Sequence, residues 1–160
     1  LQTRLSAAYK GIIGLILKQG ALDFMSGSPM DFTNFTEQAV DIHHIFPRAY
    51  CEKMHYNRHK WNSIVNKTPI TAHTNRTVGG SAPSVYLAKI EGEGRVAEDD
   101  LDKYLETHLV NVNSLRNDDF DTYFISRAKS VIALISSAMG KAVTNLDGDD
   151  VVEAFGSPLV

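Results

Sequence analysis

The feature that most constrains the fold is a long helical pattern near the C-terminal end of the chain. Its apolar residues recur every three or four positions, as on one face of an α-helix: Phe120, Phe124, Ala128, Val131, Ile135 and Ala138. Asn117 can cap the start of this helix, and Gly140 follows the last apolar position, where helices commonly end. The pattern predicts a helix over 118–139.

Most of the remaining chain is also helical in pattern. Helices are predicted over 1–22, 72–78, 83–91 and 97–110, and a helix is possible within 48–61. Residues 39–46 (AVDIHHIF) differ, because they are rich in β-branched residues and end at Pro47, which predicts a strand. Short extended pieces are expected at 64–65 and 68–71, and a turn at 147–150. The fold class is therefore α+β.

Length and composition indicate one globular domain. The 160 residues are 43% hydrophobic and 22% charged, which excludes disordered and fibrous classes. The one cysteine, Cys51, allows neither an intrachain disulfide nor a paired-cysteine zinc ribbon, and it fits a reducing cytoplasm. No apolar run reaches the roughly 18 residues of a membrane span, so no membrane partner is expected. The chain begins with Leu1 rather than Met, and we expect it to be a fragment or processed form of a longer protein.

Charge is unevenly distributed along the chain, although the net charge is only −3. Between residues 43 and 76 the acidic residue is Glu52 alone, and five of the six histidines lie in this window. The basic residues of the window are Arg48, Lys53, Arg58, Lys60, Lys67 and Arg76. Residues 91–121 are predominantly acidic. A local basic patch is typical of a phosphate-binding surface; a solvated basic loop is the alternative interpretation.

Two adjacent histidines stand just before the proline that ends the predicted strand. His43 and His44 belong to the segment DIHHIFP, Asn66 follows His44 by 22 residues, and Asn75 follows Asn66 by nine. Neighbouring strand residues point to opposite faces, so both histidines can serve one site only where the strand frays or bulges. A loop asparagine, a short strand and the first turns of a helix would bring Asn66 and Asn75 back to that site.

These residues resemble the motif of HNH (ββα-metal) nucleases. The chain is more particularly similar to the C-terminal nuclease domain of GmrSD-type modification-dependent restriction enzymes. The segments that carry this resemblance are DIHHIFP at 41–47, NSIVNKTPI at 62–70, TNRTVG at 74–79, PSVYL at 83–87 and FDTYFISRAKSVIALI at 120–135. The resemblance implies a small ββα-metal core at 37–80, embedded in a mostly helical domain. An N-terminal helix and loop (1–36), helical support (81–140) and a C-terminal tail (141–160) would surround it.

The resemblance also implies a role for each motif residue. His44 is the general base, and Asn66 fixes the loop and orients that base. His43 and Asn75 ligate the metal. Asn62 competes with Asn66 for the middle position, because it precedes the same pair of apolar residues. Asp41 would share a strand face with His43 and could hydrogen-bond to it.

Other residues are candidates for contacts with the nucleic acid or a metal. Lys67 and Arg76 are the cations nearest the motif and would bind phosphate, and His73 is a further phosphate contact or ligand. The few protein ligands, one of them an amide oxygen, favour Mg²⁺ with its water-rich shell, and Mn²⁺ as a substitute. His55 and His59 have the i, i+4 spacing of a helical zinc site, but no second pair completes it.

The implied function is metal-dependent hydrolysis of DNA phosphodiester bonds, within a restriction or anti-phage defence protein of the cytoplasm. In such proteins a nucleotide-dependent domain precedes the nuclease, and this chain has no phosphate-binding motif of that kind. Two alternatives remain open. One is a non-catalytic DNA-binding or assembly module that retains the HNH fold, and the other is an RNA-cleaving or toxin nuclease.

Overall fold

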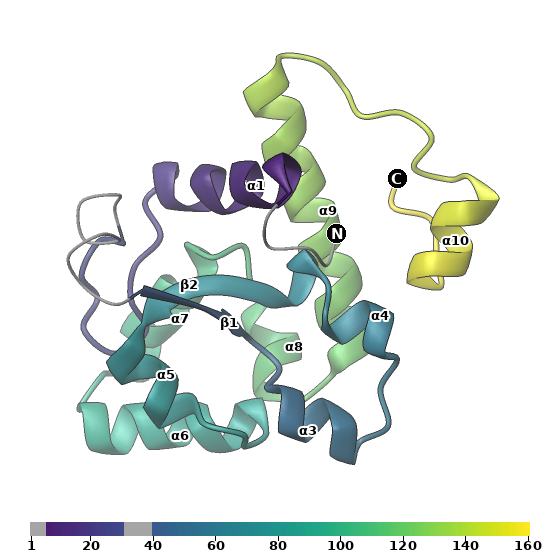
Figure 1. Cartoon of the computed structure of the whole chain (residues 1–160). Helices are drawn as coiled ribbons and strands as arrows, with labels where there is room; N and C mark the ends of the chain where they lie inside the picture. Colours follow the sequence, from purple (N-terminus) through teal and green to yellow (C-terminus); the bar gives the residue numbers. More distant parts are fainter. Residues whose placement is uncertain (1–5, 31–39) are drawn as a thin grey trace.

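The computed structural model describes residues 6–30 and 40–160, and the side chains of all of these except Val40 and Asp41. This part of the chain is mostly helical and contains one two-stranded antiparallel sheet (Figure 1). Strand β1 spans Val40–His44 and β2 spans Lys67–Thr71, with His44 opposite Lys67 in the register. Pro69 is tolerated in β2 because each strand of a two-stranded sheet has an open edge. The α+β class predicted from the sequence is confirmed.

The helices surround the sheet. They are α1 (Ala7–Lys18), α3 (Arg48–Lys53), α4 (Arg58–Trp61), the 3₁₀ helix η1 (Ile64–Asn66), α5 (Ala72–Val78), α6 (Pro83–Gly94), α7 (Glu98–Glu106), α8 (Val112–Arg116), α9 (Phe120–Met139) and α10 (Asp149–Phe155). The sheet lies between α1 on one side and α5 and α6 on the other (Figure 1). Because α5 directly follows β2, residues 40–78 have the element order β–β–α, with α3, α4 and η1 inserted between the strands.

Helix α9 begins at Phe120 rather than at residue 118, and its cap is not the predicted residue. Asp119 caps α9, since its side chain accepts a hydrogen bond from the backbone N–H of Thr122 at 3.1 Å. Asn117, the predicted cap, instead follows the last residue of α8, a short helix that the sequence pattern did not reveal. Asp118 then turns the chain with a positive φ of 55°. The prediction of Asn117 as the cap is therefore wrong.

Other segments also differ from the prediction. The extended piece expected at 64–65 is part of the 3₁₀ helix η1, and the helix expected over 97–110 ends at Glu106. The first helix ends at Lys18 rather than near residue 22, and Gly20 follows with a φ of 96°. Segment 48–61 forms two short helices, because His55 adopts a left-handed φ of 56° between them. His55 and His59 therefore do not share one helix. The turn predicted at 147–150 leads into α10, which was not predicted.

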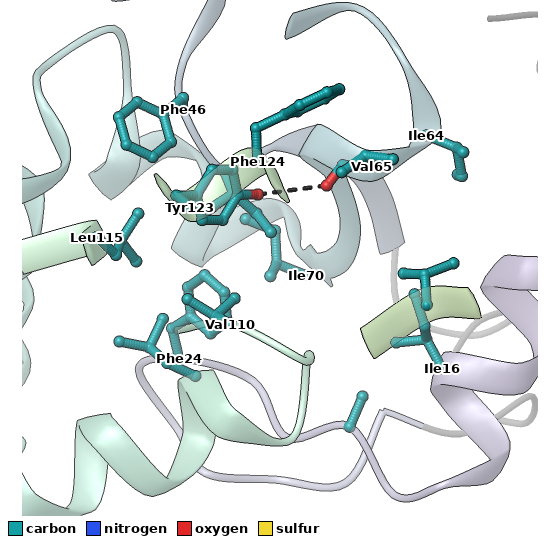
Figure 2. Packing of buried hydrophobic residues seen from close by; sticks show 14 of the residues in the cluster. Ile16, Phe24, Phe46, Ile64, Val65, Ile70, Val110, Leu115, Tyr123 and Phe124 are labelled. Atoms are coloured by element: carbon teal, nitrogen blue, oxygen red, sulfur yellow. Dashed lines mark hydrogen bonds between the residues drawn. The ribbon is translucent and has the colours of Figure 1, made fainter. Parts of the chain in front are cut away.

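The core is built around α9. Its buried residues Tyr123 and Phe124 pack with Phe46, which follows β1, and with Val65 of η1 (Figure 2). Helix α9 also contacts α1 and α8. Each fully buried large apolar side chain contributes about 1.5–3 kcal/mol to folding. Helix α9 therefore packs against both ends of the segment inserted between β1 and β2, at Phe46 and at Val65.

None of the helices in residues 6–30 and 40–160 is long and apolar enough to cross a membrane.

Candidate functional site

His44 lies at the end of β1 and is half-buried. Its Nε2 atom is 3.2 Å from Oδ1 of Asn62, and its ring meets the indole of Trp61 edge-on, with centroids 5.6 Å apart. With the Asn62 amide oxygen assigned to this contact, Nε2 is the donor, because an amide oxygen only accepts hydrogen bonds. When the ring is neutral, its lone pair then lies on Nδ1. Asn62 and Trp61 together hold the imidazole in one tautomer and one orientation.

Asn66 is fully buried and connects the two ends of the loop that follows His44. Its Oδ1 atom accepts a hydrogen bond from the backbone N–H of Phe46 at 2.9 Å. Its Nδ2 atom donates to the carbonyl oxygens of Phe46 and Trp61, both at 2.9 Å. A buried amide that satisfies three backbone groups fixes their relative positions. Asn66 thus fixes the backbone that follows β1, whereas Asn62 contacts the His44 ring directly. The two asparagines therefore have different roles.

His43 and Asn75 are the residues that the sequence assigns to a metal. The His43 ring is perpendicular to that of His44, with centroids 6.5 Å apart, and its Nδ1 atom lies 3.5 Å from the His44 carbonyl oxygen. Asn75 is half-buried in α5, the helix that packs against both strands. Asp41 pairs with Ile70 across the sheet, but its side chain is outside the described part, so its expected hydrogen bond to His43 is as well.

The donors available for a metal are few. Within residues 6–30 and 40–160, excluding the side chains of 40 and 41, no three His, Cys, Asp or Glu side chains cluster in a way that could hold a metal. One imidazole and one amide oxygen suit a hard ion that keeps several waters, such as Mg²⁺ or Mn²⁺. They do not suit tetrahedral zinc, which needs three or four nitrogen or sulfur ligands.

The three predicted phosphate contacts lie in different environments. Lys67 is 3% exposed, and its ammonium group lies over the ring of Tyr9, 5.7 Å from the centroid. Lys67 therefore does not present its charge to a phosphate on the surface, and that prediction needs correction. The physical reason is that β2 packs against α1, the helix that carries Tyr9. His73 and Arg76 are exposed on α5.

Asp23 was not predicted, and it fixes the junction between β2 and α5. One carboxylate oxygen accepts from the Thr71 N–H at 3.0 Å, and the other accepts from the Thr74 hydroxyl at 2.7 Å. Burial raises the pKa of Asp23, but hydrogen bonds from Thr71, Thr74 and Ser26 outweigh it and hold the pKa below its ordinary value. This carboxylate sets the start of the helix that carries Asn75. Its one sequence signal is an acid within the apolar run ALDFM.

Arg127 is a second buried group that the sequence analysis missed. Its Nε atom donates to the carbonyl oxygen of His108 at 3.1 Å, and Nη1 donates to that of Val65. The hydroxyl of Tyr123 also donates to Val65, at 3.4 Å (Figure 2). Burial lowers the pKa of Arg127. Helix α9 thus holds η1, and with it Asn66. The available signal was a charge on the apolar face of the predicted helix, between Phe124 and Val131.

The comparisons with known proteins leave the family open. No protein-family profile matches the chain, and no solved structure matches it significantly. An uncharacterized protein of Methanocaldococcus jannaschii is 29% identical over 124 residues, which cover 71% of this chain and 20% of that protein. The chain thus corresponds to about one fifth of the length of this relative.

Proposed function

We propose that this chain is an HNH-type, metal-dependent DNA endonuclease domain. The observation that carries the proposal is the orientation of His44 by Asn62 at the end of β1, within a β–β–α unit whose loop is closed by Asn66. A histidine held in one tautomer beside a rigid loop suits general-base catalysis. The motif resemblance and the order of the elements point to the same chemistry.

The reaction is hydrolysis of a phosphodiester bond. His44 accepts at Nδ1 a proton from the water that attacks phosphorus, while the Nε2–H bond to Asn62 keeps the ring in place. His43 and Asn75 are the residues that would hold Mg²⁺, or Mn²⁺ in its place. When bound, the ion neutralises charge on the phosphate and on the leaving oxygen. Asn66 keeps the His44 backbone fixed through Phe46, so the base does not reorganise during the reaction.

The proposed setting is a restriction or anti-phage defence protein of the cytoplasm. This rests on the resemblance to GmrSD-type nuclease domains, in which a nucleotide-dependent domain precedes the nuclease. The match to one fifth of a longer archaeal protein is compatible with such an arrangement.

Cleavage of supercoiled plasmid DNA tests the proposal. The protein is incubated with plasmid in Mg²⁺, in Mn²⁺ or in EDTA, and an RNA transcript of the same sequence is run in parallel. We expect nicked or linear DNA with either ion and intact DNA in EDTA. DNA binding without cleavage in any ion would instead support the non-catalytic module, and cleavage of RNA alone would support a ribonuclease.

A further inference from the structure

We infer that the exposed face of residues 48–60, which comprises α3, α4 and the turn between them, binds the phosphate backbone of DNA beside His44. We call this stretch the basic segment. The inference builds on the proposed function, because it takes DNA as the partner and places the DNA on the molecule. The basic segment takes the place of Lys67 as the proposed phosphate contact, because the Lys67 ammonium group is buried against Tyr9.

The basic segment carries four Lys or Arg residues, two His residues and one acid. That acid, Glu52, forms an ion pair with Arg48 at 2.8 Å. The ammonium group of Lys60 already has a partner, because it donates a hydrogen bond to the Phe155 carbonyl oxygen at 3.2 Å. Lys53, His55 and Arg58 of the segment are exposed. The positive charges of Lys53 and Arg58 are of the kind that binds phosphates without regard to base sequence.

The inner side of the basic segment is anchored in the core. Cys51 is fully buried, and the Tyr56 ring stacks on Phe120 of α9 with centroids 4.6 Å apart. Tyr56 also meets Tyr50 edge-on. The backbone that carries Lys53 and Arg58 is therefore fixed before DNA arrives, so binding orders the side chains alone, which lowers its entropic cost.

The same segment is joined directly to the proposed base. It begins four residues after His44, and it is followed at once by Trp61 and Asn62, which contact the His44 ring. Both ends of the basic segment therefore lie near the base. The first turn of α7 holds Glu98, Asp99 and Asp100 and would repel DNA. The acidic helix α10 lies beside His59 and Lys60, so Lys53 and Arg58 are the cations of the segment that the test addresses.

The test is a binding titration with the double variant Lys53→Gln/Arg58→Gln. Fluorescence anisotropy of a short DNA duplex is measured at several salt concentrations in EDTA, so that cleavage does not interfere. Each lost phosphate contact reduces the slope of log affinity against log salt by about 0.9, so we expect a slope shallower by about 2 and weaker binding at low salt. The control variant Lys10→Gln/Lys141→Gln makes the same change in charge elsewhere on the surface and should keep the parent slope.

Two results would overturn the inference: a parental slope for Lys53→Gln/Arg58→Gln, or an equal loss in the control variant. Circular dichroism melting of each variant verifies that it is folded. The outcome is independent of cleavage. If the parent nicks plasmid but the slope does not change, the proposed function stands and this surface is wrong. If the slope changes but no ion supports nicking, the surface stands and the endonuclease assignment falls.

Discussion

Asn66 is the residue whose side chain does the most to hold the site together. Its amide satisfies one N–H and two carbonyl groups of a buried loop. A buried backbone group left without a partner costs about 1–3 kcal/mol. Asn66→Ala should therefore lower the free energy of unfolding by about 3 kcal/mol or more, measured by urea denaturation. Asn66→Asp should be at least as harmful, because a carboxylate would face the carbonyl oxygens of Phe46 and Trp61.

The matched control is Asn62→Ala. Asn62 is half-buried and bonds to His44 through its side chain, so its loss should cost no more than about 1 kcal/mol. Equal free energies of unfolding for Asn66→Ala and Asn62→Ala would show that Asn66 does not stabilise the loop.

The sequence predicted which residues are candidates for the site, but it did not predict how deeply each side chain is buried. The spacing of His44, Asn66 and Asn75 indicated candidate residues, because the motif fixes their order along the chain. The bond between Asn62 and His44 depends on where a four-residue helix, α4, ends. The burial of Lys67 depends on how α1 lies over β2. Neither the end of α4 nor the position of α1 over β2 can be predicted from the local sequence pattern.

Among the elements, the start of α9 gives a direct comparison between the predicted and the observed cap. Asp119 accepts from the Thr122 N–H, and Thr122 also lowers the pKa of this carboxyl. Asp119→Ala should cost about 1 kcal/mol of stability, the usual loss for an N-cap. Asn117→Ala should cost less, because Asn117 is exposed and its side chain bonds to Asn113 in the preceding helix. Thermal melting of both variants measures the difference, and a larger loss for Asn117→Ala would favour the cap predicted from sequence.

The long helices and the short helix α5 were predictable, whereas α8 and α10 were not. Helix α9 has enough turns for its apolar period to stand out. Helices α8 and α10 have five and seven residues. Such lengths are marginal in isolation and are stabilised by tertiary contacts. For α10 these include the stacking of Phe155 on Phe124 at 5.5 Å. A periodicity argument does not detect contacts of that kind.

The stability of the whole molecule should depend on pH through His108. This imidazole is fully buried; its Nδ1 lies 2.6 Å from the Thr68 hydroxyl, and its Nε2 donates to the Leu22 carbonyl oxygen at 2.7 Å. Burial lowers the pKa of His108 from its ordinary 6.5 to about 4, and the charge of Arg127 acts in the same direction. Between these values the unfolded chain binds more protons than the folded one. The free energy of unfolding therefore falls as the pH falls.

From pH 7 to pH 5 we expect His108 to account for a loss of about 2 kcal/mol. Urea denaturation at both pH values measures it as the difference between the parent and His108→Gln. The variant should lose less stability on acidification, whereas the exposed-residue control His73→Gln should behave like the parent. Equal pH dependence in the parent and His108→Gln would show that the folded protein can protonate this ring.

The proposed nuclease activity depends on His44 as a catalytic base, and plasmid nicking by His44→Ala in Mn²⁺ tests this role most directly. The control is Lys141→Gln, which changes an exposed residue outside the basic segment. We predict a nicking rate about 10²–10⁴-fold lower for His44→Ala, the usual contribution of a general base, with DNA binding in EDTA unchanged. The control should nick like the parent. A folded His44→Ala variant that nicks at the parental rate would contradict the account.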